Sequence, residues 1–160
     1  MKTLKTSLYL LIMLTVFAAG CKKDNSDNPG ASGNNKYVYQ GKEEKIASSN
    51  YTVQNIAGAN TLSLVLEGSE TSQWIQLFFY KTGEIIPEGS FTFKENADPT
   101  YNPATNFAGG NVNLGIADAH VLTGGKIDVV KDGDSYKITV DATTSRGPIT
   151  GSYTGSISRQ

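Results

Sequence analysis

Apolar and polar residues alternate along much of the chain, most regularly near its end. Apolar side chains take every second position for much of residues 126–130, 135–142 and 149–157. Strict alternation predicts β-strands that bury one side and expose the other. Asp132-Gly133 and Arg146-Gly147-Pro148 separate these segments and are typical of tight turns. The end of the chain is therefore predicted to form an antiparallel meander of three strands.

Shorter alternating segments precede this meander. We predict strands at residues 37–40, 44–53, 61–66, 72–80, 91–93, 111–116 and 119–122. Gly124-Gly125 is interpreted as a turn, and residues 96–110, with two prolines and no alternation, as a long loop. Many short strands without an amphipathic helix indicate an all-β domain. An antiparallel β-sandwich of about nine strands is the predicted fold, and a lipocalin-like β-barrel is the alternative.

The N-terminus has a different pattern. Residues 1–7 carry Lys2 and Lys5 and no acid, residues 8–17 carry no charge, and three small residues follow at 18–20. A basic start, a short apolar stretch and small residues together predict a secretory signal over residues 1–20. The apolar stretch is shorter than the roughly 20 residues that a membrane-spanning helix needs.

Cys21 follows this signal directly and is the only cysteine. The string Ala18-Ala19-Gly20-Cys21 resembles the lipobox of bacterial lipoproteins, although Ala18 stands where leucine is commonest. The resemblance implies that Cys21 is acylated, for example with palmitate, and becomes the mature N-terminus. Each buried methylene of an acyl chain contributes about 0.8 kcal/mol, so two or more chains would anchor the protein firmly to a membrane. No thiol would then remain for a disulfide or a metal.

Composition separates a tether from a folded domain. Residues 22–35 are almost entirely polar or glycine, which predicts a flexible tether over 21–35 and a single domain over 36–160. Two of the 14 basic residues lie in the signal, which leaves 12 against 15 acidic residues and a net charge of −3. The basic residues form no cluster, so nucleic acid is not an expected partner.

A family resemblance rests on two further strings. The tail GGKIDVVKDGDSYKITVDATTSRGPITGSYTGSI and the segment Pro87–Phe93 resemble strands of small Bacteroidetes surface lipoproteins. The resemblance implies a sandwich or lipocalin-like barrel and carries over no catalytic residue. Lys22-Lys23-Asp24 resembles the start of the surface-export signal of such lipoproteins, without its acidic run. We therefore expect an anchored outer-membrane protein, at the cell surface rather than on the periplasmic face.

Candidate catalytic and metal-binding groups are few. His120 is the only histidine and has Asp118 nearby, but no G-x-S-x-G string would present a serine, so a structural role is favoured. Asp128, Asp132 and Asp134 could offer oxygen ligands to calcium, yet they do not match the EF-hand pattern and also suit a hairpin turn. The glutamates single out no catalytic pair. We predict no cofactor, no metal and no enzymatic activity.

Residues 72–80 (SQWIQLFFY) are the most suggestive segment, because neither side of this predicted strand is polar. One interpretation is a central strand covered on both sides. The other is a binding surface on which Trp74 and Tyr80 stack against a ligand while Gln76 orients it, with Tyr101 and Phe107 of the long loop closing the site. The predicted function is a non-catalytic module for a glycan or protein. A carrier of a small apolar ligand is the alternative, and a hydrolase is the least favoured.

Overall fold

The computed structural model describes residues 35–56, 58–70, 72–116 and 118–160. The signal, Cys21 and nearly all of the predicted tether lie outside these residues. Within them, no helix is long and apolar enough to cross a membrane. The strands of the described part are β1 Lys36–Tyr39, β2 Lys42–Ile56, β3 Ala59–Gly68, β4 Gln73–Tyr80, β5 Gly89–Phe93, β6 Asn106–Phe107, β7 Gly109–Leu114, β8 Ala119–Asp132, β9 Ser135–Thr144, β10 Gly147–Gly155 and β11 Ser158–Arg159.

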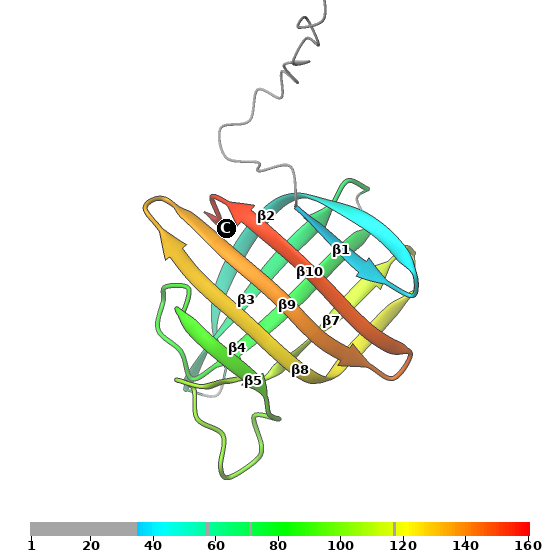
Figure 1. Cartoon of the computed structure of the whole chain (residues 1–160). Coiled ribbons are helices and arrows are strands. Elements are labelled where there is room, and N and C mark those ends of the chain that lie inside the picture. The colour runs from blue at the N-terminus through cyan, green and yellow to red at the C-terminus, as the bar shows by residue number, and fades with distance from the viewer. Residues whose placement is uncertain (1–34, 57, 71, 117) are drawn as a thin grey trace, which may run out of the picture.

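Eight of these strands close into an antiparallel barrel, as Figure 1 shows. The order around the barrel is β1, β2, β3, β4, β7, β8, β9 and β10, and β10 pairs back with β1. In this closing pair Tyr37 lies opposite Gly151. Of the remaining strands, β5 pairs with β8, β6 pairs with β5 and β11 pairs with β2. The prediction of a sandwich is therefore wrong, and the barrel alternative is confirmed.

Two long strands bend the sheet into this closed shape. The register between β2 and β3 shifts between Ile46 and Ser48, and that between β8 and β9 shifts between Leu122 and Gly124. Such bulges increase the local twist and bend of a strand. Gly124 and Gly125 consequently lie inside β8 and do not form the predicted turn. A Cβ on Gly125 would lie 2.3 Å from the Cα of Ala142, so only glycine allows β8 and β9 to pair here.

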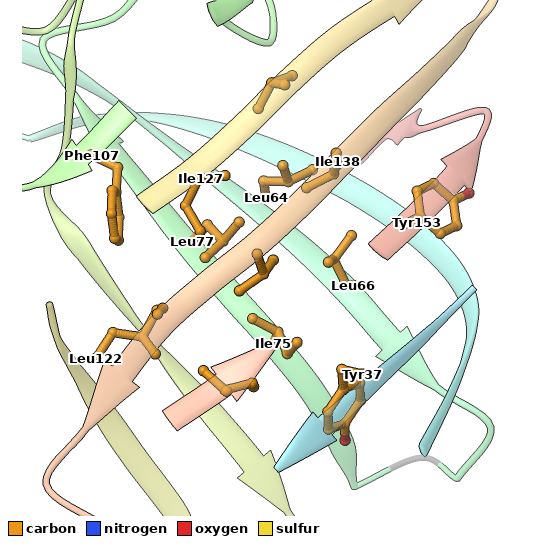
Figure 2. Packing of buried hydrophobic residues seen from close by; sticks show 14 of the residues in the cluster. Tyr37, Leu64, Leu66, Ile75, Leu77, Phe107, Leu122, Ile127, Ile138 and Tyr153 are labelled. Carbon is orange, nitrogen blue, oxygen red and sulfur yellow. The ribbon is translucent and has the colours of Figure 1, made fainter. Parts of the chain in front are cut away.

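Apolar side chains fill the interior of the barrel, as Figure 2 shows for several labelled residues. The inward apolar residues of β3 and β4, which are Leu62, Leu64, Leu66, Ile75, Leu77 and Phe79, are each at most 1 % exposed. They meet inward residues of the opposite strands. The buried apolar residues are Tyr37, Tyr39, Ile46, Leu62, Leu64, Leu66, Ile75, Leu77, Phe79, Ile86, Phe91, Phe107, Val112, Leu122, Ile127, Val129, Ile138, Val140, Ala142, Ile149 and Tyr153.

The structure confirms the late meander and shifts several boundaries. The β8–β9 turn consists of Gly133 and Asp134, one residue later than predicted, and of these two only Gly133 has a positive φ. Ile116, predicted to face inward with Val112, is 95 % exposed because β7 ends at Leu114. The long loop also ends earlier than residue 110, since β6 and the start of β7 lie within its predicted range.

Asn35 already belongs to the folded domain. Its side chain donates to the Thr154 carbonyl oxygen at 3.0 Å and accepts from the Thr154 amide at 2.8 Å. Its own carbonyl accepts from the Ile46 amide at 2.9 Å. These bonds fix the point at which the chain enters the barrel.

Candidate functional site

The outer side of β4 carries the side chains that the sequence singled out. Ile75, Leu77 and Phe79 are buried, so the residues between them project outward. These outward residues, Trp74, Gln76, Phe78 and Tyr80, are all half-buried. β4 pairs with β3 on one side and β7 on the other, so it lies in the middle of this part of the barrel.

Neighbouring strands extend this surface in register. The name "aromatic wall" is used below for the outward side chains of β3, β4, β7 and the first part of β8. Asn113 lies opposite Trp74, Asn111 lies opposite both Gln76 and Val121, and Phe78 lies opposite Gly109. Directly opposite side chains in antiparallel strands lie about 5 Å apart at Cβ and contact one another. The members of the wall are Thr61, Ser63, Val65, Glu67, Trp74, Gln76, Phe78, Tyr80, Asn111, Asn113, Ala119, Val121 and Thr123.

Charge is nearly absent from the aromatic wall. None of its members is lysine, arginine or aspartate, and Glu67 is its only carboxylate. Lys81, which directly follows β4, places its Nζ 5.5 Å from the centroid of the Tyr80 ring at one end of the wall. Glu67 accepts hydrogen bonds from Ser48 Oγ at 2.5 Å and from Asn50 Nδ2 at 2.7 Å, both on β2. The negative charge is thus held toward β2, at the margin of the wall.

The amide side chains of the wall keep free hydrogen-bonding groups. Gln76 Nε2 donates to Ser63 Oγ at 2.7 Å, which fixes the amide, and its oxygen accepts no hydrogen bond within the described part of the chain. Asn113 Nδ2 donates to the Ser72 carbonyl at 2.6 Å, and Asn113 Oδ1 is buried without a partner among the described residues. A buried acceptor without a partner costs about 1–3 kcal/mol, so a ligand that donates to it would recover that free energy.

A hollow of about 330 Å³ opens in the wall beside Phe78. Phe78, Phe93 and Val121 border it, and Gly109 and Gly110 leave its floor without side chains. A Cβ on Gly110 would lie 1.9 Å from the Gln76 carbonyl oxygen. The close pairing of β4 and β7 therefore requires glycine at this position. Glu95, at the start of the long loop, adds one carboxylate to the lining of the hollow.

Tyr101 covers part of this surface instead of leaving it open. Its ring meets that of Tyr80 edge to face, with centroids 6.0 Å apart. Its hydroxyl accepts from the Tyr80 amide at 3.1 Å and donates to the Asn106 carbonyl at 3.1 Å. Burial raises the pKa of Tyr101, and the hydrogen bond that its hydroxyl accepts from the Tyr80 amide partly opposes this shift. Tyr101 therefore holds the long loop against Tyr80.

The five predicted site residues do not share one surface. Trp74 and Gln76 lie on the aromatic wall, and Tyr80 lies at its end beneath Tyr101. Phe107 instead points into the core, fully buried, with its ring edge-on to Phe93 at a centroid distance of 5.7 Å. Phe78 lies on the alternating pattern that predicted Trp74 and Gln76. Asn111, Asn113 and Val121 join the wall only through strand pairing, which no local pattern reveals.

His120 forms a second polar cluster, at the barrel end that holds the β7–β8 and β9–β10 turns. His120 Nε2 lies 2.9 Å from Asp118 Oδ1 but makes no hydrogen bond with the described residues, whereas a histidine–aspartate relay requires one. His120 Nδ1, however, lies 2.6 Å from the Tyr39 hydroxyl, which in turn lies 2.7 Å from Thr144 Oγ1. Tyr39 is fully buried, so the hydroxyl in the nucleophile's place is shielded from substrate. The cluster closes this end of the barrel.

The three aspartates weighed as calcium ligands lie around the β8–β9 hairpin. The Asp128 carboxylate pairs with Lys126 Nζ at 3.0 Å, and hydrogen bonds from Lys126 and then Ser90 lower the pKa of Asp128. Asp132 and Asp134 are exposed at the turn. In the part of the chain that the structure describes, no three histidine, cysteine or acidic side chains form a group that could hold a metal ion.

The aromatic wall is therefore the better candidate site. It offers ring faces, neutral amides and a hollow, which suit binding of a ligand more than proton transfer or nucleophilic attack. In the histidine cluster, by contrast, the Tyr39 hydroxyl is already engaged by His120 Nδ1 and Thr144 Oγ1. A scan against protein-family models, a search of curated proteins and a search of solved structures each found no match for this chain.

Proposed function

We propose that this protein is a non-catalytic binding module, anchored to the outer membrane through Cys21 and displayed at the cell surface. Its ligand, a glycan or a protein, binds on the aromatic wall. One observation carries the proposal: Trp74 and Phe78 project outward from a barrel whose interior is filled by its own side chains. Aromatic residues of this kind dominate the energetics of many binding surfaces.

A carrier of a small apolar ligand is the second candidate, and a closed barrel is compatible with it. The inward apolar residues of β3 and β4 are at most 1 % exposed, however. A ligand inside the barrel would have to displace close-packed side chains. Removing one buried leucine costs about 2–5 kcal/mol, which indicates the free energy at stake. The outer hollow beside Phe78 needs no such displacement.

The test uses the full mature chain and panels of immobilised glycans and extracellular proteins. Trp74→Ala and Phe78→Ala are each expected to weaken binding at least tenfold. Val121→Ala, on the wall, is expected to weaken binding, whereas Val130→Ala should leave it unchanged. The two variants are matched because both valines lie on β8 and are 61 % and 55 % exposed. Binding that is insensitive to Trp74→Ala and Phe78→Ala would overturn the proposal.

The anchor has a separate test. Cys21→Ser is expected to move the protein from the membrane fraction to the soluble fraction and to abolish incorporation of labelled palmitate. Acylation contributes membrane affinity in proportion to the methylenes that it buries, and serine cannot form the thioether. Retention of the serine variant in the membrane fraction would contradict anchoring through Cys21.

A further inference from the structure

We infer that the ligand of the aromatic wall is an uncharged, hydroxyl-rich oligosaccharide. This inference rests on the proposed function and names its ligand class. Three independent properties of the wall support it: its lack of charge, its free hydrogen-bonding groups, and the spacing of its aromatic rings.

Charge argues against an anionic ligand. A bound carboxylate, sulfate or phosphate needs cationic partners to offset the loss of its hydration. No member of the aromatic wall is lysine or arginine. Lys81 places one ammonium over the Tyr80 ring at one end of the wall, 5.5 Å from the ring centroid, while Glu67 and Glu95 place two carboxylates at its margins. A cationic ligand would find Glu67 already engaged by Ser48 and Asn50. An uncharged ligand meets neither obstacle.

The hydrogen-bonding groups suit hydroxyls in particular. Asn113 Oδ1 is a buried acceptor without a partner among the described residues, and the Gln76 oxygen accepts no hydrogen bond from those residues. Asn111 lies between Gln76 and Val121 with both donor and acceptor atoms in its amide. A sugar hydroxyl both donates and accepts, so one hydroxyl can satisfy either kind of group. Asn113 is only 8 % exposed, and its oxygen has no partner among the described residues. A ligand group that donates to this oxygen would satisfy it.

The geometry suits more than one ring. Trp74 and Phe78 are four residues apart on one strand side, a separation of about 13 Å at about 3.3 Å per residue. Gln76 lies between them, with Asn111 directly across. The hollow of about 330 Å³ beside Phe78 is at the small end of ligand pockets, which suits one or two rings. A chain of sugar rings could place one ring against Phe78 and another against Trp74, with hydroxyls on the amides between.

The experiment measures retardation of the full mature protein in native gels that contain a polysaccharide. The neutral probes are a glucan, a mannan, a xylan and a galactan, and the anionic probes are polygalacturonate and heparin. At least one neutral probe is expected to retard the protein, and the anionic probes are not. Trp74→Ala and Phe78→Ala should weaken the retardation at least tenfold, and Trp74→Phe should restore most of it because a ring face remains. Circular dichroism verifies that each variant is folded.

A charge introduced on the wall sharpens the test. Asn111→Asp keeps the shape of the side chain but loses its donor, so binding of the neutral probe should fall at least tenfold. Thr150→Asp adds the same charge to an exposed position on β10 and should leave binding unchanged. Failure of every neutral probe to bind overturns the inference. Binding of an anionic polysaccharide or a protein that Trp74→Ala abolishes overturns the inference but supports the proposed function. A neutral probe that binds all wall variants equally overturns both.

Discussion

The two walls of the barrel have similar interiors and different exteriors. The "charged wall" is the outward side of β1, β9, β10 and the second part of β8, opposite the aromatic wall. It carries Lys36, Lys126, Asp128, Lys137 and Asp141, of which Lys36 pairs with Glu43 at 2.7 Å. The inward residues of both walls are equally buried: Leu64 and Ile75 on one, and Ile138 and Ile149 on the other, are all 0 % exposed.

This comparison separates what the fold needs from what it does not. On the charged wall, alternating inward apolar residues are sufficient to form its half of the barrel, because the outward side chains there are solvated. The aromatic wall has the same inward pattern, so its outward Trp74 and Phe78 are not required to close a barrel. Large apolar residues gathered on an exterior surface commonly mark an interaction site. The predictions below test this separation, beginning with the interior.

Gly110→Ala should have the largest effect on stability. A Cβ at this position would lie 1.9 Å from the Gln76 carbonyl oxygen, so β4 and β7 would have to move apart. Overpacking of this kind costs about 3 kcal/mol of unfolding free energy. Gly83→Ala is the control, since its Cβ would meet nothing within 4 Å. Urea unfolding measures both. If Gly110→Ala were as stable as Gly83→Ala, the close approach of β4 and β7 would not hold the aromatic wall in place.

Tyr37 makes the interior beneath the charged wall sensitive to alkali. Burial, and then the nearby charge of Glu44, raises the pKa of Tyr37 from 10.0 to about 12. Between these values the unfolded chain loses the proton and the folded chain keeps it, so stability falls as pH rises. Two pKa units correspond to about 3 kcal/mol. The unfolding free energy of the wild type should therefore fall by about 2 kcal/mol more than that of Tyr37→Phe between pH 9 and 12, because at the upper pH the folded-state group is itself half ionised. Parallel pH profiles would show that Tyr37 ionises normally.

Tyr39→Phe should lower the free energy of unfolding at neutral pH. Tyr37→Phe also removes one buried tyrosine hydroxyl, but it should not have this effect. The Tyr39 hydroxyl contacts His120 and Thr144, whereas the Tyr37 hydroxyl is buried with no partner among the described residues. Loss of the Tyr39 hydroxyl leaves His120 Nδ1 unpaired, at a cost of about 2 kcal/mol, while Tyr37→Phe should be neutral or stabilising. Urea midpoints at pH 8 compare the two variants. Equal midpoints would mean that the histidine cluster adds nothing to the fold.

How much of this fold the sequence predicts depends on the range of the contacts. The late meander is local, so alternation and turn residues are enough to predict it. The choice between sandwich and barrel depends on whether β10 pairs with β1, which brings Tyr37 opposite Gly151. Inward-facing alternation is the same in both architectures. Gly124-Gly125 was interpreted as a turn because a bulge inside a long strand uses the same residues.

The candidate site divides in the same way. Trp74 and Gln76 could be predicted because the apolar character of both sides of one strand is visible in nine consecutive residues. Phe107 was misplaced because its orientation depends on a two-residue strand, β6, that pairs with β5 inside a segment without alternation. Asn111 and Val121 reach Gln76 through the registers of two strand pairs. Register between distant segments leaves no trace in either segment alone.

Asp128→Asn should have the smallest effect, and it tests the charged wall directly. Asp128 and Lys126 are 39 % and 53 % exposed, so water and salt screen their attraction. Exposed pairs of this kind contribute no more than about 0.5 kcal/mol. Lys126 and Ser90 lower the pKa of Asp128, so its contribution is present at neutral pH and is lost as pH falls through the folded-state pKa.

Urea unfolding at pH 7 and pH 3 should show the small wild-type advantage disappearing in acid. An advantage above about 1 kcal/mol at pH 7, far beyond the usual contribution of an exposed pair, would mean that the charges hold the barrel together. The contrast between the walls would then reflect stability as much as binding.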